Sequence, residues 1–286
     1  MRKIYNIYKK LSKQIRDSLS ITIVLIGSLS TVMSIVGITL KEEIGSVWLS
    51  VLYVIVGGCL VFGAIYFLLG TIFKEEINLK IRMTDVCIKY GDIFEISGQK
   101  VIGCDTHFDM RIDDVVIRRN SLHGQLILNH VDKDNLRNVI ETKAKSLGIK
   151  PNEDGSYSFP LGTVIRYQSN VDDETYLLLA LINLNSRFEA HTDMAAYEYT
   201  LMKMWREIDS VYAMYDVVLP VLGSGSSRFD DGPKEDGKLL RCMLCTLDSS
   251  GVNLKSKVTI VLYGDKKKHK LYEYKDIYEA LIGRKG

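Results

Sequence analysis

The stretch Asp216–Phe229, with the sequence DVVLPVLGSGSSRF, decides the fold. It begins with six apolar residues, Val217–Leu222, which are typical of a strand buried on both faces of a sheet. The small residues Gly223–Ser227 follow, and glycine there permits positive φ and the close approach of a ligand. A buried strand that leads through such a loop to a helix is where α/β proteins hold phosphate groups. The stretch therefore predicts either a phosphate-binding loop or a plain turn between a strand and a helix.

Composition and motif searches exclude several classes of protein. The sequence contains no GxxxxGK[ST], which excludes a Walker-type NTPase, and no GxGxxG with an acidic residue about 20 positions later, which argues against a standard Rossmann site. A formal net charge of +2 gives no electrostatic reason to expect nucleic acid as a partner. A length of 286 residues leaves room for one α/β domain and an additional segment.

The cysteines predict neither disulfides nor a metal site. There are five of them, an odd number, and they are scattered along the chain. Cys242 and Cys245 form a lone CxxC without the second pair or the histidines that would complete a zinc site. We therefore expect both to pack in the core of a helix, with redox chemistry as the alternative. The soluble part of the chain is expected in the cytosol.

Two long uncharged stretches near the N-terminus predict a transmembrane hairpin. Residues 18–40 contain no charged residue, and neither do residues 44–73. At ~1.5 Å per residue the first stretch would form a helix of about 34 Å, enough to cross a hydrocarbon core of about 30 Å. A signal peptide is the competing interpretation, but the apolar part is too long and no small-residue cleavage site follows. We expect a hairpin over 18–73, with spans at 18–40 and about 47–73.

The distribution of charge orients this hairpin. Residues 1–17 carry six lysines and arginines against Asp17 alone, whereas the link Lys41–Glu43 carries one lysine. The basic N-terminal segment 1–17 is therefore expected in the cytoplasm, and two crossings return the rest of the chain to the same side. Small residues such as Gly27 and Gly63 allow transmembrane helices to pack closely. Two interpretations remain open: a simple anchor, or an assembly or pore formed between protomers.

Residues 78–286 are expected to form a globular domain in which strands and helices alternate. The expected strands are Leu79–Met83, Val86–Tyr90, Lys100–Cys104, Thr163–Tyr167, Tyr176–Leu184, Val217–Leu222 and Lys257–Tyr263. Four helices are expected. The first begins at a cap, Asp132 or Asp134, and runs to Leu147, with Gly148 as its terminator. The others lie at His191–Tyr215, from near Pro233, and at Tyr274–Ile282. This order predicts an α/β fold: a three-layer α/β/α domain with a mixed, mostly buried sheet.

Two further segments carry a resemblance to a known family. Tyr90–Phe94 reads YGDIF, and Lys100–Phe108 reads KVIGCDTHF, a buried strand that opens into a polar loop. Together with Val217–Ser226, their order and spacing resemble the macro domain, over about residues 78–286. In that family the aspartate of the GDI segment holds the adenine amino group. The resemblance implies this role for Asp92, with Ile93 beside the adenine ring.

The same resemblance assigns the two loops of the site. The first loop wraps the distal ribose and a phosphate in macro domains, and it corresponds to Gly103, Cys104, Asp105, Thr106 and His107. The second loop cradles the diphosphate and corresponds to Gly223, Ser224, Gly225 and Ser226. Small loop residues present N–H groups to phosphate oxygens, which agrees with this assignment. Arg228 either adds a charge-assisted contact or is a surface arginine.

The first loop departs from the family pattern. Gly103–Asp105 stands in place of an Asn-Ala-Ala-Asn-like segment, and Thr106–Asp114, THFDMRIDD, replaces a run of glycines. Macro domains that hydrolyse ADP-ribosyl groups use that asparagine and those glycines to position substrate and water. We therefore expect binding without catalysis. Asp105 and His107 could form an acid/base pair. Alternatively, the two residues could shape the ribose end, or Asp105 could cap the loop.

The combined architecture resembles the macro-domain-type membrane effector of the bacterial Thoeris antiphage system. The segments Asn120–Gln125, NSLHGQ, and Phe159–Val164, FPLGTV, are also similar to that family. The resemblance implies that a partner TIR-domain enzyme consumes NAD and makes an ADP-ribose-derived signal, such as an amino-acid conjugate, which the macro-like domain binds. It further implies a multi-pass protein of the bacterial cytoplasmic membrane that oligomerises and disrupts that membrane in abortive infection. No metal and no cofactor are expected.

Two other functions remain open. One is a membrane-anchored ADP-ribosyl hydrolase that works through Asp105 and His107. The other is a passive anchor that recruits ADP-ribosylated proteins to the membrane.

Overall fold

A computed structural model describes residues 76–114, 117–184, 190–225, 228–230 and 232–263, together with the single residue 56. The predicted hairpin, 18–73, and the predicted helix 274–282 therefore lie outside the described residues, residue 56 excepted. No helix in the described part of the chain is long and apolar enough to cross a membrane. From residue 76 onward the described residues all belong to one compact unit, Glu76–Lys270.

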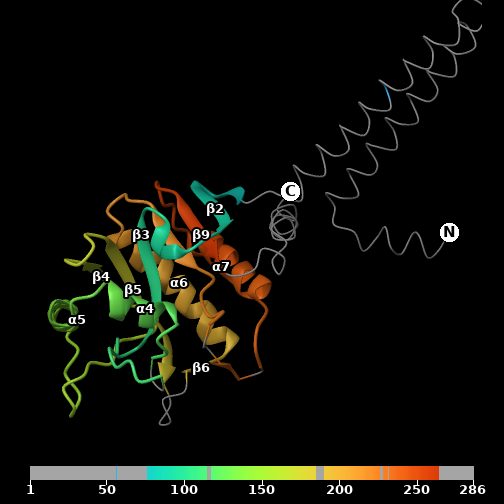
Figure 1. Cartoon of the computed structure of the whole chain (residues 1–286). Helices are drawn as coiled ribbons and strands as arrows, with labels where there is room; N and C mark the ends of the chain where they lie inside the picture. The colour runs from blue at the N-terminus through green and yellow to red at the C-terminus, as the bar shows by residue number, and fades with distance from the viewer. Residues whose placement is uncertain are drawn as a thin grey trace, which may run out of the picture. The chain divides into compact units, whose positions relative to one another are not determined.

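The described residues contain a mixed sheet whose centre is parallel (Figure 1). Its strands are β1 (Glu76–Ile81), β2 (Thr84–Tyr90), β3 (Gln99–Asp105), β4 (Val164–Gln168), β5 (Thr175–Leu184), β6 (Ala190–Thr192), β7 (Val217–Pro220), β8 (Arg228–Phe229) and β9 (Val258–Leu262). The order is β1-β2-β9-β7-β3-β5-β6-β8, with β4 paired to β5. From β2 through β9, β7 and β3 to β5 every pairing is parallel. These strands therefore all end at the same edge of the sheet.

Burial along the strands explains their places in the sheet. All five residues of β9 are buried, and in β7 only Pro220 is not fully buried, as expected for central parallel strands covered on both faces. The edge strand β1 instead alternates exposed and buried residues, so one of its faces meets solvent.

Helices cover both faces of the sheet. They are α4 (Leu122–Asn129), α5 (Lys133–Ser146), α6 (Met194–Val211) and α7 (Asp236–Ser250), with a short 3₁₀ helix η1 (Ile93–Glu95). One buried cluster joins α4 and α5 to β3, β4 and β5, through residues such as Leu126, Leu136 and Ile102. No member of that cluster comes from α6 or α7, which pack against each other, with Trp205 Nε1 donating to Thr246 Oγ1 at 3.2 Å. The predicted mixed three-layer α/β/α arrangement is confirmed.

The structure shows which of two aspartates caps helix α5. Asp132 is its N-cap, because its side chain accepts hydrogen bonds from the N–H groups of Asp134 and Asn135. The helix ends at Ser146, and Gly148 follows with a φ of 67°. Gly148 therefore terminates the helix as predicted.

Several predicted boundaries were wrong. The helix predicted at His191–Tyr215 begins only at Met194, because Asp193 is its N-cap and His191 pairs with Arg228 in the short strand β6. It ends at Val211, and the following turn has positive φ at Ala213 and Met214. The strand predicted at Val217–Leu222 ends at Pro220, since its last two residues already form the turn into the loop. Helix α4 and the strands β6 and β8 were not predicted.

The CxxC lies in α7, as predicted, but not in its core. Cys242 and Cys245 are half-buried and flank the fully buried Met243 and Leu244. Burial raises the pKa of the Cys242 thiol to about 11, assisted by the neighbouring Glu198 carboxylate. A thiol with a raised pKa is a poor nucleophile and metal ligand. In the part of the chain that the structure describes, no group of His, Cys, Asp and Glu side chains could hold a metal ion.

Candidate nucleotide-binding site

The parallel pairing brings the three predicted site segments to one edge of the sheet. Strand β2 leads to Asp92, β3 ends at Asp105, and β7 leads to Gly223. Because β2, β9, β7 and β3 are neighbours and run in the same direction, their carboxyl ends lie together. Ligands of open α/β sheets bind at this edge. The site predicted from the sequence is therefore assembled from separate segments at one end of the domain.

Asp92 has one carboxylate oxygen in use and one available. Its Oδ1 accepts from the Phe94 N–H at 2.9 Å and so caps η1. Within the described residues nothing else is hydrogen-bonded to this half-buried carboxylate, which leaves Oδ2 free to accept from an amine. Ile93 is different, because its side chain is 2% exposed and belongs to the buried cluster under α4 and α5. Only the main chain of Ile93 can reach a ligand without rearrangement.

Asp105 is used to hold the first loop together. Its Oδ1 accepts from the His107 N–H at 2.7 Å, and its Oδ2 accepts from the Asp109 N–H at 3.2 Å. The Phe108 N–H, in turn, donates to the Asp105 main-chain carbonyl at 3.2 Å. The Asp105 side chain is only 5% exposed. Asp105 thus caps the loop, which is one of the three roles considered from the sequence.

Thr106 and His107 are also engaged within the protein. The Thr106 N–H donates to the Ile182 carbonyl at 3.0 Å, and the Thr106 carbonyl accepts from Phe159 at 2.9 Å. His107 Nε2 lies 3.0 Å from Ser158 Oγ, and its Nδ1 is 3.7 Å from Asp105 Oδ1. The four successive N–H groups from Thr106 to Asp109 are therefore all hydrogen-bonded inside the domain. In this arrangement none of them is available to a phosphate.

Gly103 and Cys104 have packing roles on opposite faces of β3. A Cβ on Gly103 would stand 2.8 Å from Leu181 Cδ2, so a larger residue would force this side chain to move. Cys104 is 2% exposed within the cluster under α4 and α5, and burial raises the pKa of its thiol. Neither position has an exposed side chain that would contact a ligand, although their predicted part in the site stays a prediction.

The second loop contains main-chain N–H groups without a hydrogen-bond partner in the described part of the chain. Ser224 closes a turn, because its N–H and its Oγ both donate to the Val221 carbonyl, at 3.3 and 2.7 Å. The N–H groups of Gly223 and Gly225 have no hydrogen-bond partner among the residues that the structure describes. Unpaired N–H groups in a tight turn at the end of a buried strand form an anion-binding concavity. Of the two predicted loops, this one has the donors that a diphosphate requires.

The two glycines of this loop differ in their surroundings. Gly223 has a φ of 82°, and a Cβ there would lie 3.3 Å from Tyr197 Cε2 and close to Phe229 and Leu239. The Tyr197 hydroxyl also donates to the Leu222 carbonyl at 2.8 Å, which fixes the base of the loop against α6. Gly225 has no positive φ, and a Cβ there would meet nothing within 4 Å. Gly223 is required by the backbone, whereas Gly225 borders open space.

Two predicted site residues are only partly covered by the structure. Ser226 lies outside the described residues. The main chain of Arg228 pairs with His191 between β8 and β6, but the position of its side chain is not described. Their predicted contacts with the ligand stay predictions.

Sequence reasoning missed His123, which lies close to the first loop. This half-buried residue stands in the first turn of α4, near the carboxylates of Asp105 and Asp109. Burial lowers the pKa of the His123 imidazole, and the two carboxylates offset only part of this effect. The segment NSLHGQ was noted in the sequence, but the histidine itself lacks a partner at a recognisable spacing. Only the fold places it beside Asp105.

Comparison with solved structures defines the class of this domain. The Oceanobacillus iheyensis macrodomain with ADP superposes with a TM-score of 0.50 at 13% identity, covering 73% of this chain and 97% of that one. A mutant of the same macrodomain with ADPR also gives a TM-score of 0.50 at 13% identity, covering 73% and 99%. At this identity the likeness concerns the fold alone. The described domain has a macro-domain fold.

Sequence comparison then gives the family. The family model described as Thoeris protein ThsA, Macro domain, matches residues 86–263. The Thoeris protein ThsA of Bacillus amyloliquefaciens (strain Y2) is 30% identical over 268 residues, which cover 91% of this chain and 88% of that protein. The chain belongs to the Thoeris ThsA family.

The two glycines provide a matched pair of variants. Gly225→Val should leave the thermal unfolding temperature nearly unchanged, because the added side chain meets no neighbour and exposed substitutions usually cost less than about 0.5 kcal/mol. It should weaken binding of ADP-ribose about 10-fold or more, because the branched side chain would stand in the open space through which a phosphate approaches the N–H groups of the loop, and charge-assisted hydrogen bonds would be lost. Gly223→Val should instead destabilise the fold by about 1–3 kcal/mol through its positive φ. Calorimetry and thermal unfolding of both variants test this, and normal affinity in Gly225→Val would place the diphosphate elsewhere.

His123 should make stability depend on pH. Because its folded pKa lies below the unfolded value of about 6.5, the unfolded chain binds more protons in the interval between the two values. Stability should therefore be full above about pH 6.5 and fall as the pH is lowered through that interval. His123→Gln should reduce this loss. Thermal unfolding at about pH 5.5 and about pH 7.5 measures the difference, and the same slope in both proteins would contradict the assignment.

Proposed function

We propose that this chain is a membrane effector of bacterial antiphage defence whose macro-like domain binds an ADP-ribose-derived signal. The observation that carries the proposal is the convergence, at one edge of the sheet, of an Asp92 carboxylate oxygen and the N–H groups of Gly223 and Gly225, none of which has a hydrogen-bond partner among the described residues. Membership of the Thoeris ThsA family supports it. So do macrodomains of the same fold that have been solved with ADP and with ADPR.

In this proposal the site residues have distinct roles. Asp92 accepts from the exocyclic amine of adenine, and the loop at Gly223–Ser226 holds the diphosphate. The first loop, rigid because Asp105 caps it, sets the shape of the ribose end rather than donating to phosphate. An ADP-ribose derivative that carries an additional group, such as an amino acid, would extend past this end. A TIR-domain enzyme that consumes NAD is the proposed source of the signal.

The geometry favours binding over hydrolysis. A general base needs an accessible lone pair within reach of water or substrate. Both side-chain oxygens of Asp105 already accept main-chain hydrogen bonds, and the residue is 5% exposed. The Nε2 atom of His107 is hydrogen-bonded to Ser158 Oγ. An ADP-ribosyl hydrolase working through this pair is therefore the less favoured candidate.

The membrane function rests on the sequence of residues 18–73. Both uncharged stretches are long enough to span a bilayer. Only Lys74 and Glu75 lie between the second stretch and Glu76, the first residue of β1. A soluble ligand changes an equilibrium only through its different affinities for two states. We propose that these are dispersed and assembled protomers, and that assembly concentrates the hairpins and disrupts the cytoplasmic membrane. A passive anchor would bind ligand without assembling.

The adenine contact is tested at Asp92. Asp92→Asn keeps a carbonyl oxygen that can cap η1, but it replaces the free oxygen by an NH₂ group, which cannot accept a hydrogen bond from the adenine amine. Affinity for ADP-ribose should fall by about 1–3 kcal/mol, while the unfolding temperature stays close to that of the unchanged protein. Titration calorimetry on the full chain in detergent measures both ligand affinity and stoichiometry. Unchanged affinity in the folded variant would remove Asp92 from the site.

The assembly step is tested on the full chain. Mass measurement in detergent, with and without the nucleotide made by the TIR-domain partner, should show a larger particle when nucleotide is present. Bulky substitutions at Gly27 or Gly63 should abolish toxicity in cells and leave nucleotide binding intact. A constant mass, together with toxicity that survives deletion of residues 18–73, would contradict the mechanism.

A further inference from the structure

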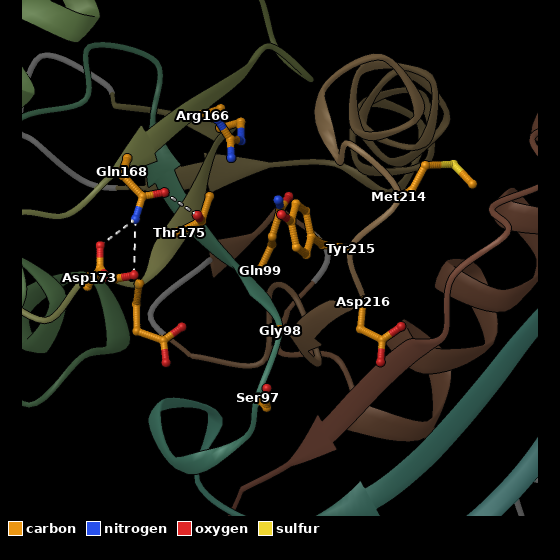
Figure 2. Close-up of a pocket in the computed structure, with 11 residues that line it drawn as sticks. Ser97, Gly98, Gln99, Arg166, Gln168, Asp173, Thr175, Met214, Tyr215 and Asp216 are labelled. Atoms are coloured by element: carbon orange, nitrogen blue, oxygen red, sulfur yellow. Dashed lines mark hydrogen bonds between the residues drawn. The ribbon is translucent and has the colours of Figure 1, made fainter.

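A second pocket, of about 580 Å³, lies at the opposite edge of the sheet from the candidate nucleotide site (Figure 2). It is lined by residues at the amino ends of the parallel strands: Gly98 and Gln99 at the start of β3, Thr175 at the start of β5, and Asp216 just before β7. Strand β3 runs from Gln99 to Asp105, so the two sites are about 20 Å apart along this strand. The pocket is therefore separate from the loops that the proposed function uses.

Gln99 is a buried polar residue of this pocket whose side chain lacks hydrogen-bond partners among the described residues. Its side chain is 3% exposed, and neither Nε2 nor Oε1 has a hydrogen-bond partner in the described part of the chain. Its main chain is well fixed, since the Gln99 N–H donates to the Asp216 carbonyl at 2.7 Å. A buried amide without partners is costly, and most buried polar groups in proteins are paired. A ligand that offers a donor and an acceptor side by side would satisfy both ends of the amide.

An aromatic side chain lines the same pocket as this amide. Figure 2 draws Tyr215 and Gln99 among the residues of the pocket lining. Tyr215 is 62% exposed although it lines the pocket, and the neighbouring Met214 is 55% exposed. Flat rings stack on such exposed aromatic side chains, at about 1–3 kcal/mol per base in nucleic-acid-binding proteins. The combination favours a planar ligand.

The charges around the pocket favour an uncharged ligand. Glu174 is neutralised by the buried Lys100, with Nζ 2.8 Å from Oε2. Asp173 and Asp216 then stand against a single guanidinium, Arg166. There is no surplus of positive charge to hold a diphosphate, whereas carboxylates readily accept hydrogen bonds from hydroxyl groups.

We propose that this pocket binds an uncharged planar ring that carries a donor and an acceptor on one edge, paired with the Gln99 amide and stacked on Tyr215. Glutamine pairs in this way with the N6 amine and N7 of adenine, and a primary carboxamide on an aromatic ring presents the same pair of groups. An adenine nucleoside and an aromatic carboxamide share this chemistry. The proposal does not depend on what the loops at the other edge bind.

The test uses the full chain in detergent and two probes, adenosine and nicotinamide. Binding is measured by calorimetry without any other nucleotide, and binding that depends on Gln99 and Tyr215 is assigned to this pocket. Gln99→Leu and Tyr215→Ser should each weaken binding of the probe about tenfold or more, because the paired edge and the stacking surface are lost. Asp92→Asn, at the opposite edge, should weaken only the binding of adenosine to the first site, so binding that persists in this variant belongs to the pocket around Gln99.

Stability provides the control for folding. Gln99→Leu should be at least as stable as the unchanged protein without ligand, because it removes an unpartnered buried amide. If this variant nevertheless fails to fold, the binding affinity of Tyr215→Ser, a substitution at an exposed position, tests the proposal instead. Binding of adenosine that depends on these residues identifies a nucleoside site, and such binding of nicotinamide identifies a carboxamide site. Binding of neither probe, or binding that both variants leave unchanged, would overturn the proposal.

Discussion

The parallel pairing of β7 with β3 on one side and β9 on the other is the constraint on which the rest of the structure depends. It buries β7 and β9 on both faces, so helices must cover the sheet on each side. It also places the ends of β2, β3 and β7 at one edge, where Asp92 and the two loops lie together. The same pairing gathers the starts of β3, β5 and β7 at the other edge, which forms the pocket around Gln99. One pattern of strand pairing thus creates two chemically different candidate sites.

The candidate nucleotide site is asymmetric in its hydrogen bonding. In the first loop Asp105 accepts from two N–H groups, and the remaining ones are also paired within the domain. In the second loop Ser224 closes the turn, and the N–H groups of Gly223 and Gly225 have no partner within the described part of the chain. An acidic residue at the end of β3 thus makes the first loop rigid and poor in donors. The diphosphate in this account depends on the second loop, and its recognition needs no catalytic group.

Much of this arrangement could be predicted from the sequence because its main elements are local patterns. Apolar runs predicted β2, β3, β5, β7 and β9, and the run of small residues after β7 predicted the loop. Elements that depend on distant partners could not be predicted in this way. Strands β6 and β8 are two or three residues long and form only by pairing with distant segments, since β6 pairs with both β5 and β8. Likewise, His123 comes near the Asp105 carboxylate, and Gln99 and Tyr215 come to line one pocket, only after the sheet has formed.

The central claim is that the second loop, and not the first, supplies the main-chain donors to the nucleotide. Amide hydrogen exchange of the full chain, followed with and without ADP-ribose, measures these donors directly. The account predicts that ADP-ribose slows exchange at Gly223 and Gly225, whereas Thr106–Asp109 change little because their N–H groups are already hydrogen-bonded. Exchange that is unchanged at the two glycines while ADP-ribose is bound, or protection that appears in the first loop instead, would contradict it.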